Sequence, residues 1–104
     1  MCWGVPGVLI DMEPEKGIAR VDFGDGVPRE VLIGITGERL ERGSLVIVHA
    51  GVIISTIDEK GLVETYSLLS DLMREAGEQE DEGMRSYYDY LLRLSRQLRG
   101  GDSS

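Results

Sequence analysis

Residues 45–57 read LVIVHAGVIISTI, with a run of mostly β-branched residues on either side of an Ala-Gly pair. β-Branched side chains favour strands, and small turn-forming residues favour a tight connection between them. Neither run alternates regularly with polar residues, so we expect two central strands, 45–49 and 52–57, each buried on both faces. This segment predicts a β-sheet core that other strands must complete.

Three further strands are expected before this segment. Residues 4–10 are mostly apolar, although Pro6 favours an edge or strand-entry position because proline has no N–H to donate. Residues 18–23 alternate, with Ala, Val and Phe on one side and Arg and Asp on the other, as in a half-buried strand. An Asp-Gly pair at 25–26 then predicts a hairpin into a returning strand at 29–33. Five short strands with tight turns predict a small closed or nearly closed barrel.

The hydrophobic period changes after the strands. We expect the barrel to occupy residues 1–57 and an amphipathic helix, packed on or beside it, to occupy 58–77. An acidic linker at 78–83 leads to an additional helix at 84–99, and 100–104 is expected to be a disordered tail. The fold class is therefore mainly β, followed by two helices.

Length and charge exclude several classes of function. The chain has 104 residues and a net charge of −8, which argues against binding to nucleic acid or to an anionic membrane. Apolar runs fall short of the roughly 18–20 residues that span a membrane, and the N-terminus does not resemble a signal peptide, so we expect a cytoplasmic protein. A core this small leaves little room for a deep substrate cavity, which argues against a self-contained enzyme.

The chain has one cysteine and one histidine, Cys2 and His49. Removal of Met1 would leave a free α-amine beside the Cys2 thiol and favour the thiolate that binds metals; alternatively, Cys2 is a neutral residue at a chain end. His49 ends an apolar run and is either a satisfied core residue or a group that faces a site. Trp3 could anchor a partner or cover one end of the barrel. A closed metal site needs about four ligands, so any metal would take ligands from elsewhere.

Three segments together resemble one family. MCWGVPG at 1–7, GIARVDF at 17–23 and GSLVIVHAG at 43–51 resemble, in order, the motifs of the HypC/HupF hydrogenase assembly chaperones. The resemblance covers residues 1–76. The additional segment at 77–104 departs from the family pattern, because many members end soon after their first helix.

The resemblance implies an OB-like barrel that acts as a non-enzymatic metallochaperone in NiFe hydrogenase maturation. Its cargo would be iron, held transiently as an Fe(CN)2CO precursor. Its partners would be an iron–sulfur scaffold protein and the immature hydrogenase large subunit. The implied metal ligands are Cys2 and His49, and the implied partner-binding residues are Trp3, Val5, Pro6 and Gly7.

Two other functions stay open on the residues alone. One is an enzyme with an N-terminal cysteine nucleophile, in which His49 or the α-amine serves as base. The other is a plain protein-interaction barrel in which Cys2 is incidental. The apolar stripe of the second helix could pack back on the barrel or against a second copy of the chain, which leaves self-association open; it comprises Tyr87, Leu91, Leu94 and Leu98.

Overall fold

The computed structural model describes residues 4–35, 39–77 and 82–101. The strands are β1 (Val5–Glu13), β2 (Ile18–Asp22), β3 (Pro28–Ile33), β4 (Leu45–His49) and β5 (Val52–Thr56). The helices are α1 (Glu59–Glu75) and α2 (Glu82–Arg96), with a 3-10 turn at Pro14–Lys16 and a π-helical turn at Gln97–Gly101. Most of the expected acidic linker and disordered tail lies outside the described residues.

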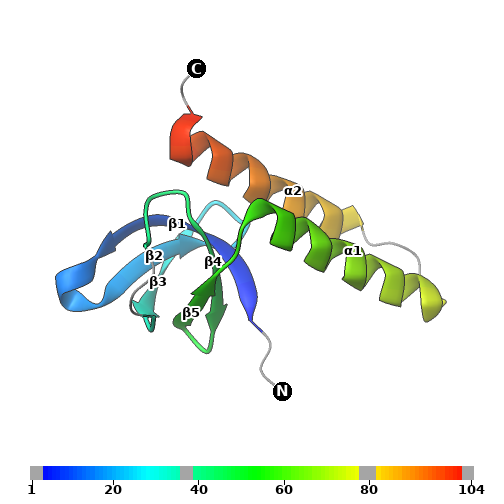
Figure 1. Ribbon diagram of the computed structural model, residues 1–104, viewed down its shortest axis with the longest axis horizontal. Helices are drawn as coiled ribbons and strands as arrows, with labels where there is room; N and C mark the ends of the chain where they lie inside the picture. The colour runs from blue at the N-terminus through cyan, green and yellow to red at the C-terminus, as the bar shows by residue number, and fades with distance from the viewer. Residues whose placement is uncertain (1–3, 36–38, 78–81, 102–104) are drawn as a thin grey trace.

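The five strands close into a barrel in the order β1-β2-β3-β5-β4, with β4 returning to pair with β1 (Figure 1). Neighbouring strands are antiparallel except β3 and β5, which run parallel through the pairs Leu32↔Val52 and Ile33↔Ile53. Closure gives the sheet no long free edge. The expected small OB-like barrel followed by two helices is thereby confirmed.

Strand β1 is longer than the sequence pattern predicts. It continues past Ile10 to Glu13, because a register shift between Leu9 and Asp11 inserts one extra residue opposite β2. Such a bulge bends a strand and lets it follow the curvature of a barrel. Met12 still packs against the interior core and pairs with the buried Ala19, whereas Asp11 is exposed and Glu13 is half-buried, so the apolar pattern ends before the strand does.

The hydrophobic core has two parts, one on each side of the barrel wall. Val8 and Leu9 are consecutive in β1 and both fully buried, so one faces the helices and the other faces the barrel interior. The interior part comprises Leu9, Ala19, Val21, Val31, Val46, Val48 and Ile53. The part between barrel and helices comprises Val8, Leu45, Leu62, Tyr88 and Leu91. Helices therefore cover the outer face of β1 and β4 (Figure 1).

The expectation that both central runs are buried on two faces is correct for β4 and wrong for β5. In β5, Ile53 is fully buried, whereas 44% of Ile54 is exposed and Thr56 is also exposed. The helices pack over β1 and β4 and leave the outer face of β5 to solvent. Burial of that face depends on where the helices lie, which the apolar run does not encode.

The two helices form an antiparallel pair beside the barrel (Figure 1). Asp58 caps α1 by accepting a 2.7 Å hydrogen bond from the Gly61 amide, and the chain leaves the helix at Gly77 with φ of 84°. The apolar stripe of α2 packs back on the barrel, where Leu91 is fully buried. Neither helix in the described ranges is long and apolar enough to cross a membrane.

Candidate functional site

The start of β1 meets the end of β4 at one rim of the barrel. Val5 pairs with Val48 and Pro6 pairs with Ile47, so β1 starts beside the β4–β5 turn (Figure 1). This pairing joins the first and third segments of the sequence motif, which lie some forty residues apart in the chain.

Glycines allow β1 to run close to its neighbours at this rim. A Cβ on Gly7 would lie 2.4 Å from Val21 Cγ1 and 3.1 Å from the Asp22 carbonyl oxygen. A Cβ on Gly4 would lie 2.0 Å from Ile47 Cγ2. Real Cβ atoms do not approach other atoms to 2.0 or 2.4 Å, so any larger residue at either position would force its neighbouring side chain or the strand to shift. Close packing thereby holds the strand entry against β2 and β4.

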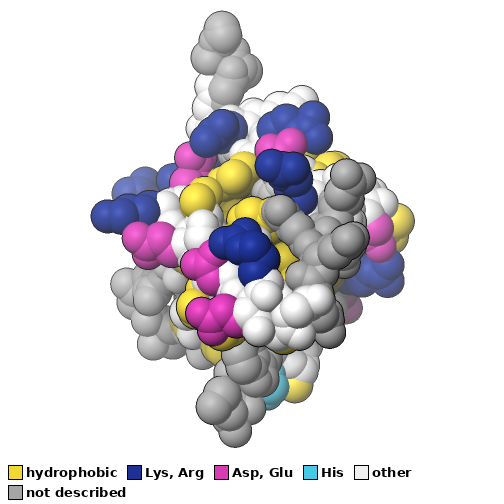
Figure 2. Space-filling model, turned by 90° about the vertical axis from the view of Figure 1, so that its right-hand side faces the viewer, with side chains coloured by type: hydrophobic (Ala, Val, Ile, Leu, Met, Phe, Trp, Pro, Cys, Tyr) yellow, Lys and Arg dark blue, Asp and Glu magenta, His cyan; other side chains and the backbone are white. Residues whose placement is uncertain are grey.

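His49 is the last residue of β4 and pairs with Val52 of β5. Its half-buried side chain reaches the surface at the rim (cyan in Figure 2). The turn that follows has positive φ angles at Ala50 (54°) and Gly51 (80°). Glycine adopts a positive φ angle at low steric cost. The turn ends the strand at His49 and leaves it on the rim.

A groove of about 560 Å³ lies at the same rim. Its lining residues are Val5, Phe23, Asp25, Arg29, Glu30, Val31, Val48, Ala50 and Gly51. The valines supply an apolar floor, and the charged residues lie toward the β2–β3 loop. A hydrogen bond from Arg29 lowers the pKa of Asp25, so this carboxylate stays ionised and paired. An open, mostly apolar groove with a charged margin is suited to docking a protein segment.

The predicted site residues differ in their exposure at the rim. Val5 is 50% exposed and lines the groove, whereas Pro6 and Gly7 are buried within β1. Pro6 and Gly7 can therefore shape the strand entry, and their own surfaces contribute little to a contact. Cys2 and Trp3 lie outside the described residues. Within the described ranges, no three His, Asp or Glu side chains gather as a metal site.

Sequence reasoning missed a polar cluster that links α2 to the β2–β3 loop. Asp22 is 4% exposed, although the alternation places it on the outer face of its strand. Its Oδ1 accepts hydrogen bonds from the amides of Gly24 (2.8 Å) and Gly26 (3.1 Å), and its Oδ2 accepts one from the Tyr90 hydroxyl (2.8 Å). The hydrogen bond to Asp22 raises the pKa of Tyr90. The Asp-x-Gly spacing is the one sequence signal that could have indicated this loop.

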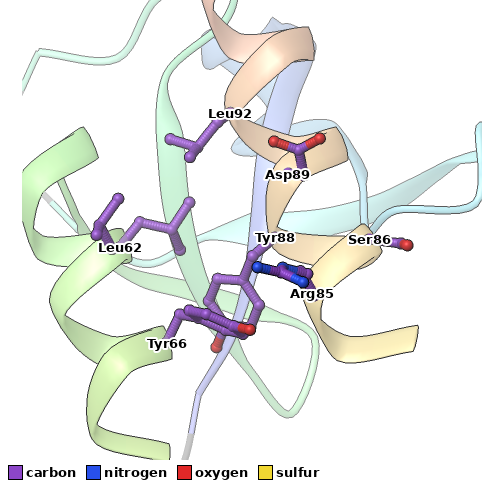
Figure 3. Close-up of a pocket in the computed structure, with 8 residues that line it drawn as sticks. Leu62, Tyr66, Arg85, Ser86, Tyr88, Asp89 and Leu92 are labelled. Carbon is purple, nitrogen blue, oxygen red and sulfur yellow. The ribbon is translucent and has the colours of Figure 1, made fainter. Parts of the chain in front are cut away.

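A second groove, of about 370 Å³, lies between α1 and α2 (Figure 3). The rings of Tyr66 and Tyr88 lie side by side within it, with centroids 5.4 Å apart, and Leu62 and Leu92 extend its apolar surface. Arg85 and other polar residues of α2 line its margin. This arrangement is an interhelical packing surface with Ser86 and Asp89 among the polar residues at its margin.

The fold and the rim define a class: a small closed barrel with a helical pair, in which the N-terminal strand meets a histidine-ended strand. The family model described as the HupF/HypC family matches residues 1–69, so the chain belongs to that family. It is also similar to a protein named Hydrogenase maturation factor HypC from Helicobacter hepaticus. The two are 29% identical over 82 residues, which cover 79% of this chain and 93% of the relative.

Proposed function

We propose that this protein is a hydrogenase maturation chaperone that carries an Fe(CN)2CO precursor. It receives the iron unit on an iron–sulfur scaffold protein and delivers it to the immature hydrogenase large subunit. Family membership and the name of the Helicobacter relative support the role in maturation. The observation that carries the proposal is the Val5↔Val48 pair, which brings the start of β1 to the rim where β4 ends in His49.

Cys2 and His49 are the proposed iron ligands. Cys2 is two residues from Gly4, a separation that extended chain spans in at most about 7 Å, and Gly4 precedes the residue paired with Val48. Thiolate sulfur and imidazole nitrogen are both ligands that proteins use for iron. Two ligands leave coordination positions for the partner, so iron can pass between proteins by ligand exchange. A carrier requires this incomplete site, because its cargo must leave.

Partner docking is assigned to the rim. Trp3 and Val5 supply apolar contact, Val5 doing so beside the groove of about 560 Å³, and Pro6 and Gly7 set the course of the strand that presents them. The cargo is handed on unchanged, so the protein needs no catalytic residue of its own. The cytoplasm is the compartment we expect for this role.

The test is anaerobic co-expression with the scaffold protein and the large subunit, comparing the wild type with Cys2→Ala. We expect Cys2→Ala to lose co-purifying iron and hydrogenase maturation while keeping the fold. Val63→Ala, an exposed apolar change on α1, is the matched control and should keep both. Retention of iron and maturation by Cys2→Ala would refute the carrier role and favour a plain interaction barrel. Turnover of a small substrate by the isolated protein, lost in Cys2→Ala, would favour an enzyme.

His49 is tested separately in the same assay. His49→Ala should weaken iron retention less than Cys2→Ala, because the thiolate remains as a ligand. Iron retention equal to that of the wild type would remove His49 from the ligand set.

A further inference from the structure

The beginning of β1, at Val5–Gly7, is paired with a strand on only one of its two edges. Val5 to Val8 pair with β4, whereas pairing with β2 begins only at Val8↔Asp22. The Leu9 amide donates to the Ser44 carbonyl and the Leu9 carbonyl accepts from the Gly43 amide, so Leu9 directs its backbone groups toward β4. Backbone direction alternates along a strand. Pro6 therefore directs its backbone carbonyl to the other edge, before the pairing with β2 starts.

Helix α2 supplies the missing partner at that edge. The Tyr87 hydroxyl donates a 2.7 Å hydrogen bond to the Pro6 carbonyl oxygen, across 81 positions of sequence. Proline has no N–H, so position 6 presents no second backbone group that needs a partner there. The proline and the tyrosine together complete the hydrogen bonding of a half-paired strand entry.

The Tyr87 ring is held from two sides. A Cβ on Gly24 would lie 2.4 Å from Tyr87 Cδ1, and Gly24 has φ of 113°, so glycine makes room for the ring at the β2–β3 loop. On the helix, the ring meets Tyr88 edge to face, with centroids 5.3 Å apart and an interplanar angle of 85°. Burial raises the pKa of Tyr87 to about 12, so its hydroxyl stays protonated and donates at physiological pH.

The same turn of α2 also anchors the loop beside this strand. Tyr90, three residues after Tyr87, donates to Asp22, whose other oxygen accepts from the Gly24 and Gly26 amides. Two phenols from one helical turn therefore hold both the strand entry and the loop against which it packs. Both lie beyond residue 69, where the family match ends.

We infer that α2 braces the N-terminal strand, and that Tyr87 is a positioning residue which fixes the Pro6 carbonyl and so holds Gly4 and Val5 in place at the rim. The mechanical part of this inference depends only on the contacts described. The part that concerns iron transfer rests on the proposed function, in which Cys2 holds the cargo.

The decisive experiment compares Tyr87→Phe with Tyr88→Phe in the full-length, metal-free protein. Tyr88→Phe is a matched control, because it removes a hydroxyl from the neighbouring ring, which faces the α1–α2 groove. Amide hydrogen exchange at Val5 and Gly7 should be about fivefold faster in Tyr87→Phe than in the wild type. Loss of one hydrogen bond makes local opening of the strand easier by about this factor. Amides of β5, which does not pair with β1, should be unchanged in both variants. Equal exchange at Val5 and Gly7 in the two variants would overturn the brace.

Transfer is measured in the co-expression assay. We expect a partial loss of hydrogenase maturation in Tyr87→Phe and the wild-type yield in Tyr88→Phe. A wild-type yield in Tyr87→Phe, with Cys2→Ala inactive, would overturn the positioning role. If Cys2→Ala stayed active, the carrier function would fall, and the exchange measurement would still decide the brace.

Discussion

Helices α1 and α2 are of similar length and both are amphipathic, yet they are attached to the barrel in different ways. In α2, Tyr88 and Leu91 are buried in the cluster that includes Val8 of β1. In α1, 59% of Leu68 and 52% of Leu72 are exposed. The helix that directly follows the barrel is thus less covered than the one that comes later. Leu62 of α1 is buried in the same cluster, so both helices pack on the strands, and α2 contributes two of the buried side chains against one from α1.

The polar contacts show the same difference. Ser95 of α2 donates a 2.6 Å hydrogen bond to the Gly43 carbonyl just before β4. The first turn of α1 is tied to α2 through two 3.0 Å hydrogen bonds from Arg96 to Glu59, and the Ile57 amide just before it donates to the Leu45 carbonyl of β4. Helix α2 therefore adds to the attachment of α1, and changes at the buried residues of α2 should lower the stability of the molecule more than changes at the exposed residues of α1.

The strongest test of this comparison removes one buried and one exposed leucine. Leu91→Ala should lower the free energy of unfolding by about 2–5 kcal/mol, because it leaves a cavity between α2 and the barrel. Leu72→Ala, the matched change on α1, should alter it by no more than about 0.5 kcal/mol. Urea unfolding followed by circular dichroism measures both. Equal losses would show that the two helices are attached alike.

A smaller effect is expected at Ser95. Ser95→Ala leaves the buried Gly43 carbonyl without its donor, which should cost about 1–3 kcal/mol of unfolding free energy. Ser67→Ala, an exposed serine on α1, is the control and should change little. The same urea titration compares them. Unchanged stability in Ser95→Ala would mean that this hydrogen bond adds nothing measurable to the attachment of α2.

The smallest effect concerns pH and the link between the helices. Hydrogen bonding from Arg96 lowers the pKa of Glu59 below its ordinary value. A carboxyl with a lowered folded-state pKa contributes stability above its unfolded-state pKa and loses it as pH falls through the folded value. The pair is largely exposed, so its contribution should stay below about 1 kcal/mol.

The free energy of unfolding should therefore fall less between neutral pH and pH 3 in Glu59→Gln than in the wild type. The measurement is the urea midpoint as a function of pH, with Glu64→Gln, an exposed carboxyl on the same helix, as control. Identical pH profiles for wild type and Glu59→Gln would show that the Arg96–Glu59 pair does not stabilise the attachment of α1.

Much of the fold and part of the site could be predicted from local patterns. Apolar runs and turn residues indicated the five strands, Asp58 indicated the start of α1, and the motif segments indicated the family that the comparison confirmed. The outer face of β5 and the burial of Asp22 were predicted wrongly, since both depend on where α2 lies. The roles of Cys2 and His49 stay predictions.

The sequence by itself determined the elements and the residues available for chemistry: a barrel built from short β-branched runs, two amphipathic helices, and one cysteine and one histidine. These follow from interactions between near neighbours in the chain, which periodicity and turn residues record. Only the tertiary structure decided which faces are covered and that Tyr87 meets Pro6 across 81 positions. Such contacts depend on how helices and barrel pack together, and no local pattern specifies that geometry.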